Sequence, residues 1–417
     1  MVKILSWLMV FYGYFFLISQ NAQAQLLALN ELETRISKEV IMGDLLSYAF
    51  QKNPGIQAAQ EKWRVKVEQH RITTSYPDPQ LMATYFPDPI ETRLGPQDWN
   101  VNLSQMIPFP GKLSTAGDVV EADAKIARLN LDKTIRDVMV SIRESFYELY
   151  YIRKAKSVAH EQIKLLDHLR KAAETAYARD RATFMDVVKA QSQSGQLRYD
   201  LMLLNDLEQT ESTRLNSLLN RMPDAPIGRL QDPVFPVMTI NLEKIYRLAE
   251  ENQEELRMAD LHVEKADAQK DLAFFENLPN FKVGLSYSSI GDPDVPMPPR
   301  NAGDDAVGVQ FGITIPLWFN KNKGRMGRAR AELRAARAAK SVQVNETRAK
   351  IRAMYFRLEN ARRIMTLYKE DLLPQAAKAM ETAETWFQEG ESSFSDFVET
   401  QSVWYNFQLA LARAQAD

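Results

Sequence analysis

The stretch AVGVQFGITIP, residues 306–316, alternates strictly between two kinds of side chain. Every odd position from Val307 to Ile315 is apolar, and glycine, glutamine or threonine fills the positions between. Successive side chains of a strand point to opposite faces, so this pattern predicts a strand with one apolar and one polar face. Such a strand suits either a half-buried soluble sheet or a membrane barrel with lipid on one side and water on the other.

Three further stretches alternate in the same way: FKVGLSYS (281–288), WNVNLS (99–104) and, less cleanly because of Met82, QLMATY (80–85). We expect long, turn-rich loops at 86–97 and 289–305 to join these strands in pairs. The other strand ends lead directly into helices through IPFPGK and IPLWFNKNKG. Aromatic side chains gather at that boundary, as they do where a barrel meets lipid headgroups: Phe109, Trp318 and Phe319. The context therefore favours a membrane β-barrel.

Four strands are too few to close a barrel, for which about eight is the practical minimum. An open sheet edge in hydrocarbon would leave unpaired N–H and C=O groups at a cost of several kcal/mol each. The strands must therefore belong to a barrel shared between copies of the chain. The strand count alone allows two copies or three.

Helical periodicity fills most of the remaining chain. We expect helices at 41–75, 112–179, 183–220, 241–277, 323–388 and 392–416. The helix at 112–179 has apolar residues at three- and four-residue steps and, at 1.5 Å per residue, would be on the order of 100 Å long.

The chain contains the same unit twice. FMDVVKAQS (184–192) returns as FSDFVETQS (394–402), and IRESFYEL (142–149) returns as IRAMYFRL (351–358). The two copies lie about 210 residues apart, which is far too long for the period of a solenoid repeat, so they indicate a tandem duplication. The predicted organisation is a first repeat at 25–220, a Pro-rich linker at 221–240 and a second repeat at 241–417.

The N-terminus and the composition indicate where the protein is located. Residues 1–24 have a lysine, an apolar run and an Ala-x-Ala site, which predict a cleaved signal peptide; the alternative is a transmembrane anchor. The chain has no cysteine, so we expect no disulfide and no lipidated N-terminus. Its net charge of −2 gives no indication of nucleic acid as a partner.

The signal peptide, the duplicated unit, the strand pairs, IPFPGK before a very long helix and the F-x-D-x-V-x-x-Q helix start together resemble the TolC-type outer membrane efflux proteins. The resemblance implies a mostly α fold with a membrane β-barrel. It also implies a homotrimer sharing a 12-stranded barrel in outer-membrane lipid and an α-helical tunnel through the periplasm. Such a protein is the passive exit duct of a tripartite pump and works with a periplasmic adaptor and an inner-membrane efflux transporter. The alternative is a soluble periplasmic coiled-coil scaffold or adaptor.

The resemblance also implies candidate site residues at the ends of the helix pairs. A cation-selective ring at the periplasmic constriction would be formed by Asp396, Glu399 and Asp186. Aromatic residues that help close the mouth would be Tyr177 and Phe387. The tips that dock to the adaptor would be Arg179, Asp180, Arg181, Gly390 and Glu391.

Catalytic signatures are missing from the sequence. There is no G-x-S-x-G motif and no P-loop, and the four histidines are scattered along predicted helices. We therefore expect no enzymatic activity, no cofactor and no metal site. In the first helix start, Asp186 and Lys189 are expected to neutralise each other one turn apart, whereas Asp396 and Glu399 share a face.

Overall fold

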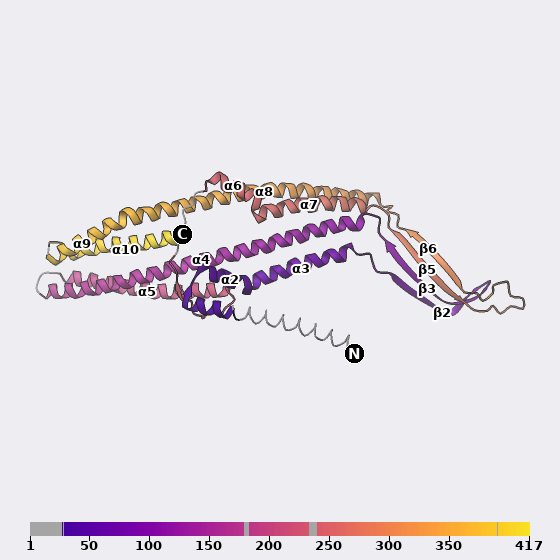
Figure 1. The fold of residues 1–417 in the computed structure, drawn as a ribbon, viewed down its shortest axis with the longest axis horizontal. Coiled ribbons are helices and arrows are strands. Elements are labelled where there is room, and N and C mark those ends of the chain that lie inside the picture. The colour runs from indigo at the N-terminus through magenta and orange to yellow at the C-terminus, as the bar shows by residue number, and fades with distance from the viewer. Residues whose placement is uncertain (1–26, 28, 179–182, 233–239, 390) are drawn as a thin grey trace, which may run out of the picture. The chain divides into compact units, whose positions relative to one another are not determined.

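The computed structural model describes residues 27, 29–178, 183–232, 240–389 and 391–417 (Figure 1). The predicted signal peptide therefore lies outside the described residues. The chain divides into two compact units, and each unit takes segments from both sequence repeats. The sheet unit comprises Ala58–Lys133 and Tyr246–Arg348, and the hairpin unit comprises the described parts of Met1–Gln57, Thr134–Ile245 and Ala349–Asp417. The sequence repeats are therefore not separate folding bodies.

Four antiparallel strands form one sheet in the sheet unit. They are β2 (Gln80–Thr92), β3 (Gly95–Ile107), β5 (Phe281–Ile290) and β6 (Ala306–Ile313), in the order β2-β3-β5-β6. The central pair, β3 with β5, joins the first repeat to the second. All four predicted strands are confirmed, and the two repeats contribute one hairpin each to a common sheet.

The first strand pair is longer than the sequence indicated. Most of the stretch at 86–97, expected to be a loop, continues β2 and β3 as far as a tight turn at Arg93–Leu94. Pro87 and Pro89 are tolerated because β2 is an edge strand, and the register shifts between Tyr85 and Ile90. In the second pair, β5 ends at Ile290 and the predicted loop follows it.

Glycine is required where the two strand turns meet. Gly95 has a φ of 135°, and a Cβ there would lie 1.7 Å from the carbonyl oxygen of Gly291. Gly291 in turn donates its N–H to the carbonyl oxygen of Pro96 at 2.7 Å. A close backbone approach therefore joins the turns of the two repeats.

The first predicted helix of each repeat is broken in two, so the expectation of continuous helices at 41–75 and 241–277 was wrong. The first repeat has α2 (Met42–Lys52) and α3 (Pro54–Thr74), and the second has α6 (Leu242–Asn252) and α7 (Glu254–Phe275). Asn53 and Gln253 lie between the halves with extended backbones, at ψ of 121° and 129°. A proline disfavours the helical conformation of the residue before it, which explains the first break. The second break lies at the equivalent place without a proline beside it.

The long helices follow the prediction more closely. They are α4 (Lys112–Tyr177) in the first repeat and α8 (Phe319–Thr366) in the second. The second continues through a π-helical segment, Leu367–Leu372, into α9 (Leu373–Glu389). Pro374 lies two residues beyond the π segment, and the N–H of the intervening Leu373 donates to the carbonyl oxygen of Tyr368. A proline cannot continue the regular hydrogen-bond ladder, which accounts for the wider turn before it.

The hairpin unit contains the returning helices α5 (Phe184–Leu218) and α10 (Phe394–Ala416), together with two hydrophobic clusters. One cluster packs the helical residues 29–38 and α2 against α4 and the end of α5, and includes Ile36, Leu45, Ile142 and Leu215. The other cluster, described below, joins the two helix pairs.

The first part of the predicted linker is docked against this core. Two short parallel strands, β1 (Glu39–Val40) and β4 (Arg229–Leu230), pair there. The guanidinium of Arg153 donates to the carbonyl oxygens of Ile227 and Gly228. Residues 221–232 are therefore packed rather than free, while 233–239 lie outside the described residues.

Among the helices of the described residues, none is both long and apolar enough to cross a lipid bilayer.

Candidate functional sites: the apolar sheet face and the paired helix starts

One face of the sheet is a continuous apolar surface. Register places Leu81, Leu103, Leu285 and Val309 on one row, with equivalent rows on either side. These side chains are exposed, and Phe311 is the most open of the β6 set at 82%. A sheet face of this kind needs an apolar environment that the described residues do not provide.

The opposite face is polar. Asn102 donates from its side-chain amide to Oε1 of Gln310 at 2.9 Å, although β5 lies between their strands. Small residues on this face of β5 and β6, Gly284 and Gly308, leave room for that bond. The predicted alternation is therefore confirmed in β5 and β6. In the first strand pair it has exceptions, because Met82 and Met106 lie on the polar face and Gln105 lies on the apolar face.

The repeated motif that opens α5 and α10 is a capping box in both copies. In α10, the amide of Asp396 donates to Oγ of Ser393 at 3.2 Å, and the amide and hydroxyl of Ser393 donate to Oδ2 of Asp396. In α5, Thr183 and Asp186 make the same three bonds. The conserved spacing between the two copies thus satisfies orphan N–H groups at each helix start. Asp186 and Asp396 have a structural role before any other is considered.

Glu399 has no part in the cap. It lies one turn after Asp396, and both side chains are exposed. The first copy has Lys189 at the equivalent place, and its ammonium donates to Oγ of Ser395 at 3.2 Å. Lys189 was expected to pair with Asp186, but its amine contacts the start of α10 instead, while the Asp186 carboxylate is held by the capping box. One helix start therefore touches the other through Lys189 and Ser395.

An aromatic pair holds the second helix pair together. Phe387 on α9 stacks against Phe397 on α10, with ring centroids 5.8 Å apart. Phe397 is fully buried in a cluster that also contains Leu166, Ala173 and Ala190 from α4 and α5. The structure thus places Phe387 in packing between helices. Sequence analysis missed Phe397, although its place inside the repeated motif, opposite Val187 of the first copy, marks it.

The first helix pair has a looser equivalent. Tyr177 is 48% exposed and its ring lies 6.0 Å from that of Phe184. Of the predicted docking tips, Arg179, Asp180, Arg181 and Gly390 lie outside the described residues. Glu391 is exposed, and its amide donates to the carbonyl oxygen of Trp386 at 2.8 Å.

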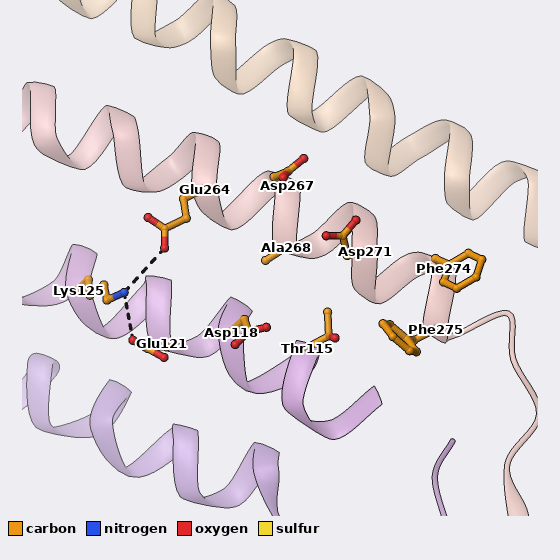
Figure 2. A pocket seen from close by; sticks show the side chains of 10 residues that line it. All are labelled: Thr115, Asp118, Glu121, Lys125, Glu264, Asp267, Ala268, Asp271, Phe274 and Phe275. Carbon is orange, nitrogen blue, oxygen red and sulfur yellow. Dashed lines mark ion pairs between the residues drawn. The ribbon is translucent and has the colours of Figure 1, made fainter. Parts of the chain in front are cut away.

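A groove between α4 and α7 in the sheet unit is lined by carboxylates (Figure 2). Lys125 lies between two of them, 3.0 Å from Glu121 and 3.7 Å from Glu264. The hydrogen bond to Glu121 raises the pKa of Lys125. Within the described part of the chain, no group of three or more potential ligands is placed to hold a metal ion. Lys125 therefore links α4 to α7 through its ion pair with Glu264.

Comparison with known proteins agrees with this architecture. Residues 245–417 match the model of the outer membrane efflux protein family. A comparison with curated protein sequences finds no match. Among solved structures, the outer membrane protein VceC of Vibrio cholerae is 18% identical with a TM-score of 0.72, and the alignment covers 90% of this chain and 92% of VceC.

Two further structures are similar over comparable lengths. A membrane protein of Pseudomonas aeruginosa is 13% identical with a TM-score of 0.78, covering 92% of this chain and 89% of its own. The CmeC outer membrane channel of Campylobacter jejuni is 13% identical with a TM-score of 0.71, covering 90% and 82%. At these identities the likeness establishes the fold. Residues 245–417 match the outer membrane efflux protein family, and the chain as a whole has the fold of these outer membrane proteins.

Proposed function

We propose that this protein is the outer-membrane exit duct of a tripartite efflux pump, conducting substrates passively. The observation that carries the proposal is the four-stranded sheet, which has an exposed apolar face and an opposite polar face. The family match of the second repeat and the fold of the whole chain support the same function. A passive duct needs no catalytic group and no cofactor.

The working form is proposed to be a homotrimer. In the described sheet, β2 and β6 each have a strand neighbour on one side only. Lipid would make those two edges costly, and pairing β6 of one copy with β2 of the next satisfies both. Three copies give a closed barrel of about 12 strands, within the range observed for outer-membrane barrels.

The partners are proposed to be a periplasmic adaptor and an inner-membrane efflux transporter. The adaptor would dock to the tips at Arg179–Arg181 and Gly390–Glu391. Near these tips, Asp396 and Glu399 of three copies would form two acidic rings, with Asp186 adding a third carboxylate position. Rings of carboxylates favour cations. Because Asp396 is also a capping residue, Glu399 is the position that tests the ring without disturbing the helix start.

Fractionation and conductance test this function. The full-length protein is expected in the outer-membrane fraction, to run as a trimer on unheated gels, and to form cation-selective channels in planar bilayers. Recovery as a soluble periplasmic protein without channel activity would favour the scaffold or adaptor alternative and overturn the proposal.

A further inference from the structure

The junction between sheet and helix differs sharply between the two repeats. In the second repeat, Ile315, Leu317, Trp318 and Phe319 are exposed in succession, the last two at 76% and 78%. In the first repeat, the equivalent aromatic residue, Phe109, stacks on Phe281 with ring centroids 6.2 Å apart. The first junction therefore packs against its own chain, whereas the second presents its apolar side chains outward.

The charges that follow each junction differ in the same way. Lys321 and Lys323 are exposed in the first two turns of α8, and neither has a carboxylate within ion-pair distance in the described part of the chain. In the first repeat, Lys112 donates to Oδ1 of Asn280, and the next charged residues of α4 are Asp118 and Glu121. Within the described residues, the second junction is therefore followed by positive charge that no carboxylate pairs, and the first junction is not.

The position of the two lysines suits a membrane surface. At 1.5 Å per residue, Lys321 and Lys323 lie about 3 and 6 Å along the helix from Phe319. The headgroup layer of a bilayer is about 5–8 Å thick on each side, and charges act across a further Debye length of about 8–10 Å. Arg334 and Arg337, also exposed on α8, lie about 22 and 27 Å from Phe319, beyond that reach.

We propose that the segment Ile315–Lys323 binds the anionic phospholipid headgroups of the periplasmic leaflet. The proposal rests on the proposed outer-membrane function and names a lipid partner for it. Trp318 and Phe319 lie among the headgroups, as aromatic residues do at bilayer interfaces, and the two lysines contact the phosphates beside them. The segment occurs once per chain, so a trimer has three such sites.

A second copy of the chain is the less suitable occupant. The helix that leads into the other sheet edge, α3, contains two carboxylates, and both already pair within the helix: Glu61 with Arg64 and Glu68 with Arg71. With Lys62 and Lys66 added, and with the exposed Asp78 before β2 counted, residues 54–79 keep a net positive charge and would repel the lysines of α8. An anionic lipid surface supplies the missing charge.

The test is lipid binding to the purified full-length trimer, measured by native mass spectrometry with phosphatidylglycerol and with phosphatidylcholine. The variant is Lys321→Gln with Lys323→Gln, and the matched control is Arg334→Gln with Arg337→Gln. A basic residue near an anionic surface contributes about fivefold in affinity, so the lysine variant should lose phosphatidylglycerol on the order of tenfold or more. Its binding of phosphatidylcholine, and the binding of both lipids by the control, should stay unchanged.

Several outcomes would overturn the proposal. Equal losses in the lysine variant and the arginine control would mean that general positive charge is responsible. Competition by inorganic phosphate alone would indicate a soluble anion site instead of a lipid surface. Weaker trimers of the lysine variant in phosphatidylcholine would indicate a second copy as the occupant. A wild-type protein that fails to enter the membrane fraction would contradict the proposed function itself, a result distinct from a membrane trimer without lipid preference.

Discussion

The two roles of Asp396 can be separated by substitution. Ser393→Ala removes the capping hydroxyl, whose oxygen accepts the Asp396 amide at 3.2 Å, and leaves both carboxylates in place. Loss of a serine cap typically costs about 1 kcal/mol, within a range of about 0.5–2 kcal/mol. Thr183→Ala should cost a similar amount, because the α5 cap has the same geometry. Neither variant should change ion selectivity.

Glu399→Gln makes the complementary change. It removes an exposed charge that takes no part in the cap, so it should weaken cation selectivity and block by trivalent cations while leaving helix stability nearly unchanged. Adding Asp396→Asn should weaken selectivity further. Reversal potentials in planar bilayers measure selectivity, and thermal unfolding measures stability. If Glu399→Gln with Asp396→Asn keeps wild-type selectivity and trivalent block, the acidic ring is wrong and the duplicated aspartates are caps alone.

Three other predictions follow from packing, membrane exposure and charge. Phe397→Ala should destabilise the hairpin unit by about 3–5 kcal/mol, seen as faster proteolysis of α9 and α10, since the ring is fully buried; wild-type resistance would contradict its core role. Phe311→Arg should weaken barrel insertion by about 2–4 kcal/mol near the bilayer midplane, and Gln310→Arg should not. Equal effects of the two variants in urea titrations would refute the assignment of Phe311 to lipid and Gln310 to the lumen. The pKa of the Glu208 carboxyl is lowered overall. Partial burial acts to raise it, but the hydrogen bonds from Lys156 and Arg153 have the larger combined effect. The stability that Glu208 adds, on the order of 1–2 kcal/mol, is therefore present above its unfolded pKa and lost as pH falls through the lowered folded pKa. The difference in unfolding free energy between wild type and Glu208→Gln should shrink in that acid range, and a difference independent of pH would contradict the assignment.

Local patterns predicted the parts of the fold that local chemistry determines. Alternation in residues 306–313 gave the correct faces of β6, and the matched motifs at 184–192 and 394–402 gave two equivalent helix starts. The capping boxes are also readable from Thr183 and Ser393, each three residues before an aspartate.

Other features depend on tertiary context. The break at Gln253 has no proline beside it, so helical periodicity runs through it unmarked. Pro87 and Pro89 argue against a strand unless the strand lies at an edge, which only the sheet order reveals. The contact of Lys189 with Ser395 joins residues 206 positions apart, and no local pattern could choose it over Asp186.

The facing of β6 tests the central claim most directly. Because the chain has no cysteine, single cysteines at Val309, Gln310 and Phe311 can be introduced without a background. A membrane-impermeant maleimide applied to outer membranes should label the cysteine at 310, which faces the water-filled lumen, and leave 309 and 311 unlabelled in lipid. Labelling of 309 and 311 with protection of 310 would contradict the assignment of the apolar face to lipid, and with it the outer-membrane duct.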